Sequence, residues 1–207
     1  MQSALKNGLY TPAQIAAVTR LPLEAVHKAM EYKLIRPKSV REGRTARRKL
    51  SMAQAVFLCM EARGLKSLPL AERRRVAKAI ERDRAMDGMY VSNGSVIYIE
   101  CKSAREDVDA GLRRLASAER MIHSDPEILR GAPVYKGTRI PVHAIADMLA
   151  QGASVEEILE GYPALTRQKL ELAPLYAKAF PRRGRPVVRP WAKRRPRRVG
   201  RQRLAGG

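Results

Sequence analysis

The sequence predicts a mainly α-helical protein with an N-terminal winged helix-turn-helix, a central β-hairpin and helix, a C-terminal three-helix helix-turn-helix domain and a disordered basic tail. Three observations lead to this fold class. Helix-capping signals recur along the 207 residues, two short segments alternate like hairpins, and a formal net charge of +21 is concentrated in two places. We expect four segments, at residues 1–66, 67–120, 121–180 and 181–207.

Composition limits the class of protein. Hydrophobic residues make up 45% of the chain but aromatic residues only 5%, which favours small helical modules with aliphatic cores. No window approaches the roughly 20 apolar residues of a membrane span, and the amino terminus lacks a signal peptide, so we expect a cytoplasmic protein. Cys59 and Cys101 lie far apart and outside any ligand spacing, so reduced thiols are expected, with no metal and no cofactor.

The positive charge lies in two separate elements. Residues 181–207 contain eleven Lys or Arg and no acid, so the first 180 residues hold 30 basic groups against 20 acidic ones. Residues 36–49 add seven basic groups against the single acid Glu42. Such an imbalance indicates a polyanionic or acidic partner.

Residues 11–35 carry two helix starts in quick succession. Thr11 is placed to cap the first helix, Pro12 suits its first turn and Gln14 completes a capping box. The chain then turns and restarts at Pro22 with apolar residues at helical spacing. This outline is typical of a helix-turn-helix, whose second helix meets the major groove of DNA. The residues expected at its turn and on its outer side are Arg20, Glu24, His27 and Lys28.

Residues 34–50, LIRPKSVREGRTARRKL, indicate a basic hairpin with Gly43 in its turn, and SMAQ opens another capped helix at Ser51. Residues 9–65 thereby resemble the MerR-type DNA-binding family, in which a helix pair is followed by a wing of the form LI.P…G..R.. and a helix. The resemblance implies that wing arginines clamp the DNA backbone; a solvated basic loop is the alternative. The residues assigned to DNA here are Arg36, Arg41, Arg44, Arg47 and Arg48.

The middle of the chain predicts a second hairpin, because Asn93 and Gly94 join two alternating apolar runs and tolerate the positive φ of a tight turn. A two-stranded ribbon is marginal alone, so we expect helices or the ribbon of a second subunit to cover it. A helix over residues 104–120 follows, with Val108, Leu112 and Leu115 on one side. We interpret residues 67–120 as a linker and the dimerisation region of a homodimer.

Residues 121–180 combine a shaped loop with three helix signals. Gly131 and Gly137 allow backbone conformations that other residues avoid. A first helix over residues 142–150 precedes helices capped by Ser154 and Thr166. Pro174 predicts a kink or an early end of the third helix.

The motif GAPVYKGTRIPV at residues 131–142 is the most specific signal of the chain. With its flanks it closely resembles a small helix-turn-helix family, long catalogued only as a domain of unknown function, whose signature reads dP.i..G.PvikGTRIpv..il..la.G.s.eeil..yp.lt. The resemblance implies a VapB-type antitoxin that binds DNA or dimerises through this domain. It also implies a VapC-like PIN-domain ribonuclease toxin as the partner.

Catalysis is not expected. The loop GxPxxxGTR looks like a phosphate-binding loop, but Lys136 precedes Gly137, whereas a P-loop needs Gly-Lys followed by Ser or Thr. His27, His123 and His143 lie in no triad or metal pattern, so we expect them on the surface or in loops.

The basic tail has two readings. It can be a nonspecific nucleic-acid arm, or a toxin-neutralising segment that orders on binding. Trp191, the only tryptophan, favours the second reading, because aromatic and arginine anchors are common in interfaces. The residues assigned to toxin binding are Arg182, Arg183, Arg185, Val187, Val188, Arg189, Trp191, Arg194 and Arg195.

These observations predict an antitoxin of a type II toxin–antitoxin module. As a dimeric autorepressor it would bind double-stranded operator DNA, and its tail would neutralise the ribonuclease. The alternative is a stand-alone transcription regulator without a toxin partner.

Overall fold

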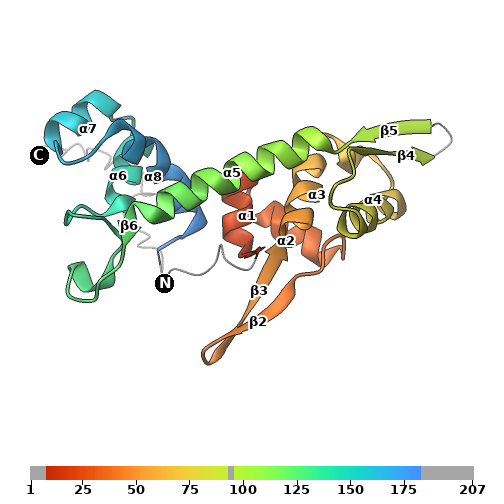
Figure 1. The fold of residues 1–207 in the computed structure, drawn as a ribbon, viewed down its shortest axis with the longest axis horizontal. Helices are drawn as coiled ribbons and strands as arrows, with labels where there is room; N and C mark the ends of the chain where they lie inside the picture. Colours follow the sequence, from red (N-terminus) through yellow and green to blue (C-terminus); the bar gives the residue numbers. More distant parts are fainter. Residues whose placement is uncertain (1–7, 93–95, 183–207) are drawn as a thin grey trace, which may run out of the picture.

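A computed structural model describes residues 8–92 and 96–182 of the chain. Within these ranges the protein is mainly helical, with eight α-helices and three small antiparallel sheets, which confirms the predicted class at that level. The molecule is elongated, and the long helix α5 runs between a module at one end and a ribbon of two strands at the other (Figure 1). None of the helices in these ranges is long and apolar enough to cross a membrane.

The N-terminal part consists of two short helices and a three-stranded sheet of order β1-β3-β2. Thr11 caps α1 by accepting from the Gln14 N–H at 3.2 Å, and the Gln14 side chain accepts from the Thr11 N–H at 2.7 Å, so the predicted capping box is present. We call β2 and β3 the basic hairpin. The elements are β1 (Leu9–Tyr10), α1 (Pro12–Thr19), α2 (Leu23–Glu31), β2 (Lys38–Glu42) and β3 (Thr45–Ser51).

Three helices and a second hairpin form the middle of the molecule. Ser51 and Gln54 make the predicted capping box at the start of α3, and α5 begins two residues before the predicted position. We call β4 and β5 the aromatic ribbon, because Tyr90 and Tyr98 pair across it. The elements are α3 (Met52–Ala62), the 3-10 turn η1 (Leu65–Ser67), α4 (Leu70–Arg82), β4 (Gly88–Ser92), β5 (Val96–Glu100) and α5 (Lys102–Arg120).

The C-terminal module contains the three predicted helices. Ser154 and Thr166 cap α7 and α8, and Gly152 takes a φ of 96° after α6. Pro174 does not end α8, which continues to Ala179, because a proline costs one backbone hydrogen bond that tertiary packing can offset. The elements are β6 (Ile122–His123), η2 (Leu129–Gly131), β7 (Val134–Tyr135), α6 (Val142–Ala150), α7 (Val155–Gly161) and α8 (Arg167–Ala179).

Helix α8 joins the two halves of the molecule. It packs against α5 and α6 and also against α1, which lies at the other end of the sequence. Leu175 and Phe180 contact both hydrophobic clusters, the N-terminal one around α1, α3 and α5 and the C-terminal one around α6 to α8. The division into four segments stays a prediction, but α5 of residues 67–120 and α8 of residues 121–180 both pack against α1 of residues 1–66.

One histidine differs from the expectation. His143 lies on α6 with only 8% of its surface exposed, and its Nε2 is 2.8 Å from the carbonyl oxygen of Phe180. The prediction of a surface or loop histidine is therefore wrong for this residue, because the end of α8 folds over it. His27 is exposed, as predicted.

Candidate nucleic-acid interface

The outer side of α2 presents the polar residues that the sequence assigned to DNA. Glu24, His27 and Lys28 are all exposed, whereas Val26 and Ala29 are buried against the core. Arg20 is exposed at the turn before α2 with a φ of 59°, a left-handed conformation that ends α1 abruptly. The four residues are therefore accessible on or beside a single helix.

The basic hairpin has two unlike faces. In its antiparallel register Val40 pairs with Arg47 and Ser39 with Arg48, so Arg47 and Arg48 point to opposite sides. On the Arg47 side, the Glu42 carboxylate binds the Arg47 Nε at 3.2 Å and the Lys49 Nζ at 2.9 Å. One acid therefore offsets part of the positive charge on that face.

The opposite face is positive without an ion pair. Arg41 pairs in register with Ala46 and Arg48 with Ser39, which places both arginines on one face. Neither forms a salt bridge within the described residues, and both are exposed. Unpaired guanidinium groups on a rigid hairpin are suited to bind phosphate, because their donors match its oxygens bidentately.

A groove separates this face from α2. It has a volume of about 550 Å³ and is lined by His27, Met30, Glu31, Pro37 and Arg48. Arg48 therefore stands across an open channel from the outer side of α2. Sequence reasoning missed the groove, since it depends on how the hairpin folds back toward the helix.

The remaining two arginines of the hairpin region lie at its ends. Arg44 is exposed in the turn, next to Gly43 with a φ of 62°. Arg36 is exposed where the chain leaves α2, and its carbonyl oxygen accepts from the Gln54 Nε2 at 2.8 Å. That bond holds the base of the hairpin against α3.

The C-terminal module offers a different surface. Helix α7 exposes Glu156, Glu157 and Glu160, and hydrogen bonds from backbone N–H groups lower the pKa of Glu156 and Glu157. Both carboxylates are therefore ionised at neutral pH. Arg167 binds Glu156 but leaves the helix net negative. A negative helix surface repels a phosphate backbone, so α7 is poorly suited to DNA.

The residues assigned to toxin binding lie outside the described ranges, apart from Arg182. The Arg182 guanidinium binds the Asp147 carboxylate of α6 at 2.8 Å. Residues 183–207, including Trp191, are not described by the structure, and their assignment stays a prediction.

Comparisons with known proteins concern the C-terminal module. The family described as "Protein of unknown function (DUF433)" matches residues 122–177. The uncharacterized protein y4eO of Sinorhizobium fredii is 49% identical over 71 residues, which cover 34% of this chain and 32% of that protein. The chain therefore matches about a third of the length of this curated relative.

A crystal structure of a DUF433 member from Anabaena variabilis is similar over 35% of this chain and 72% of that chain, with 33% sequence identity and a TM-score of 0.27. The predicted resemblance to a family of unknown function is confirmed for residues 122–177. The assignment to VapB-type antitoxins stays a prediction.

Proposed function

We propose that the chain is the antitoxin of a type II toxin–antitoxin module, which binds double-stranded operator DNA as a dimeric autorepressor. In this proposal α2 is a recognition helix and the basic hairpin is the wing beside it. The observation that carries the DNA half is the unpaired Arg41 and Arg48 face, which stands across a groove from the outer side of α2.

Charge distinguishes the two predicted helix-turn-helix units, residues 1–66 and residues 121–180. The basic hairpin is positive and accessible, and Arg20 and Lys28 are exposed beside and on α2, whereas α7 is net negative. We therefore assign DNA to residues 1–66 and leave the module at residues 121–180 as a scaffold. Its packing on α1 and α5 supports that role, because it fixes the start of the basic tail relative to the DNA-binding end.

The toxin half of the proposal rests on the resemblance of the GAPVYKGTRIPV motif to VapB-type antitoxins and on the composition of residues 181–207, which contain eleven basic groups, no acid and the single tryptophan. We propose that this tail binds an acidic PIN-domain ribonuclease, with Trp191 as an apolar anchor. The alternative function is a stand-alone DNA-binding regulator whose tail is an electrostatic arm.

The deciding experiment is a pull-down from native lysate, washed with nuclease, with full-length protein and a form that ends at Pro181. Recovery of a nuclease-like protein by the first form alone supports the antitoxin, and Trp191→Ala in the full chain should weaken that recovery. Recovery of DNA alone by both forms would leave the stand-alone regulator. DNA binding itself is measured with labelled duplexes from the chain's own promoter region, and no preference for them over random duplex would contradict autoregulation.

A further inference from the structure

The aromatic ribbon has an outer face that no part of the described chain covers. The register places Tyr90 opposite Tyr98, and Val96 lies two residues before Tyr98 on β5, so these three side chains share the face that points away from the core. Tyr90 is 73% exposed, Val96 74% and Tyr98 52%. On the inner face Val91 is buried, and Met89 and Ile99 pack against the main hydrophobic cluster.

The rings of Tyr90 and Tyr98 contact each other and form a continuous aromatic surface. Their ring centroids lie 5.1 Å apart with planes tilted by 54°, within the range of favourable aromatic pairs. Gly88 leaves the space that the Tyr98 ring fills, because a Cβ at this position would lie 2.2 Å from the Tyr98 hydroxyl oxygen. The chain therefore holds Tyr98 flat beside the backbone of β4 while half of its surface stays in water.

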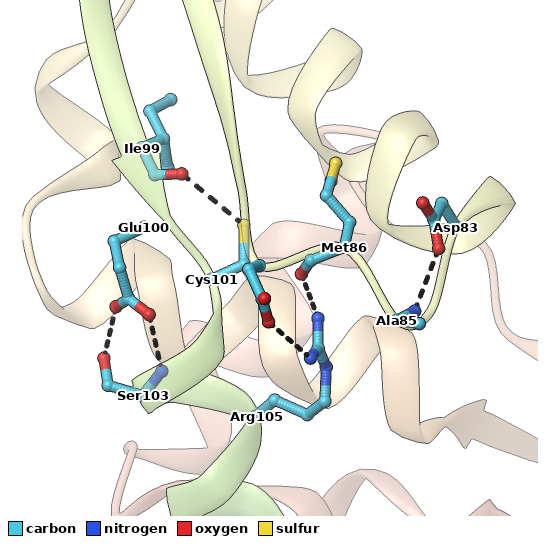
Figure 2. Close-up of polar contacts among 9 residues, drawn as sticks. Asp83, Ala85, Met86, Ile99, Glu100, Cys101, Ser103 and Arg105 are labelled. Atoms are coloured by element: carbon cyan, nitrogen blue, oxygen red, sulfur yellow. Dashed lines mark hydrogen bonds and ion pairs between the residues drawn. The ribbon is translucent and has the colours of Figure 1, made fainter.

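The base of the ribbon is held to helix α5 by several polar contacts (Figure 2). The Cys101 N–H donates to the Asp87 carbonyl oxygen at 2.7 Å, and Arg105 binds both the Asp87 carboxylate and the Met86 carbonyl oxygen. Glu100 turns back to accept from the Ser103 N–H at 2.8 Å and from its hydroxyl. The ribbon projects beyond α4 from this fixed base (Figure 1).

The charge of this face identifies its occupant. The face carries no basic side chain, although the chain has a formal charge of +21, and its single acid, Glu100, is engaged by Ser103. Within the two strands a nucleic acid or an acidic protein would find no cation, and Arg63, which lies near Glu100 at the base of the ribbon, is already bound to Asp107 and Ser103. A second copy would find the uncharged side chains of Tyr90, Val96 and Tyr98, so two strongly basic chains can approach here with little local repulsion.

The geometry is also self-complementary. Two such faces packed around a two-fold axis bring four tyrosine rings together and turn two marginal ribbons into a four-stranded sandwich. We propose that the outer face of the aromatic ribbon, formed by Tyr90, Val96 and Tyr98, binds the same face of a second copy of this chain. It supplies the dimer that the proposed function assumes, and it can be tested without DNA.

The exposed area sets the strength of this dimer. Whole aromatic side chains bury about 150–250 Å², so the three side chains leave on the order of 300–400 Å² bare in each copy. A stable specific interface buries about 1,200–2,000 Å² in total. The two ribbon faces together would bury somewhat more than half of the lower limit of about 1,200 Å². The dimer therefore dissociates on dilution, and an operator with two half-sites strengthens it.

The test is sedimentation velocity of the full-length protein over a wide concentration range, without DNA. The wild type should shift from monomer to dimer as the concentration rises. Tyr90→Ser and Val96→Lys should each raise the dimer dissociation constant about tenfold or more, because each change occurs on both sides of the axis. Tyr32→Ser is the matched control, since Tyr32 is 58% exposed at the end of α2, and it should leave the constant unchanged.

Circular dichroism spectra identical to the wild type establish that each variant is folded. A monomer at every concentration, or a dimer that tolerates both ribbon changes, would overturn the proposal. Binding of fluorescent oligo(dT) that Tyr90→Ser abolishes and Val96→Lys strengthens, with no dimer, would instead make the ribbon a base-stacking platform and would also overturn it. Neither result bears on whether α2 and the basic hairpin bind duplex DNA.

Discussion

Removal of the two unpaired arginines of the basic hairpin should change how salt affects DNA binding. Each phosphate contact contributes about −0.9 to the slope of log affinity against log salt concentration. The double variant R41A/R48A should therefore have a slope flatter by about 1.8. For a rise from 50 to 200 mM salt, the affinity of the wild type should fall about tenfold more than that of the variant.

The assay is fluorescence anisotropy with a labelled operator duplex at four or more salt concentrations. R47A is the matched control: it removes one positive charge from the same strand, but Arg47 lies on the opposite face and is held by Glu42. Its slope should stay close to that of the wild type. If R47A flattened the slope by the value of a full phosphate contact, about 0.9, the assignment of the DNA-facing side would be refuted.

Three further predictions concern stability and are checked by urea unfolding. G111A should lose about 1–3 kcal/mol through overpacking, because a Cβ there would lie 2.7 Å from the Val18 Cγ1, whereas G161A, which meets nothing within 4 Å, should not be destabilised. S51A should lose about 1 kcal/mol with the cap of α3, and S39A, in an exposed strand, should lose much less. Burial raises the pKa of Glu119, whose Oε1 has no hydrogen-bond partner in the described part of the chain. The folded state thus holds this proton more tightly than the unfolded chain, and the carboxyl costs stability as the pH rises through the raised pKa. E119Q should therefore be more stable than the wild type at pH 7, with the difference gone below about pH 4; an equal difference at both pH values would contradict the linkage.

Local signals in the sequence predicted local structure well. Thr11, Ser51, Ser154 and Thr166 each cap the helix that was expected to follow, because a cap needs only residues within one turn of each other. The same holds for the strands on either side of residues 93–95. The exposure of His27 and Lys28 was also predictable, since helical periodicity decides which side of α2 faces the core.

Features that depend on distant parts of the chain were not predictable. The burial of His143 requires the end of α8, 37 residues later, to cover it. The split between Arg47 and Arg48 requires the register of the hairpin, since a shift by one residue would exchange their faces. The groove beside Arg48 requires the angle between hairpin and helix. The bare face of the ribbon was left open by the sequence, which allowed helices or a second copy as its cover.

The contact between α1 and α8 has a consequence during protein synthesis. Helix α1 packs against α5, where Gly111 lies close to Val18. It also packs against α8, residues 167–179, which is made about 150 residues later. At about 5–20 residues per second, the ribosome needs on the order of 10–30 s to make that distance. During this interval the apolar side of α1 has no partner from α8. The amino-terminal half of a nascent chain should therefore be open to chaperones and proteases until α8 has emerged. Cellular levels of the protein should respond to mutations at Leu175 and Phe180, which contact both clusters.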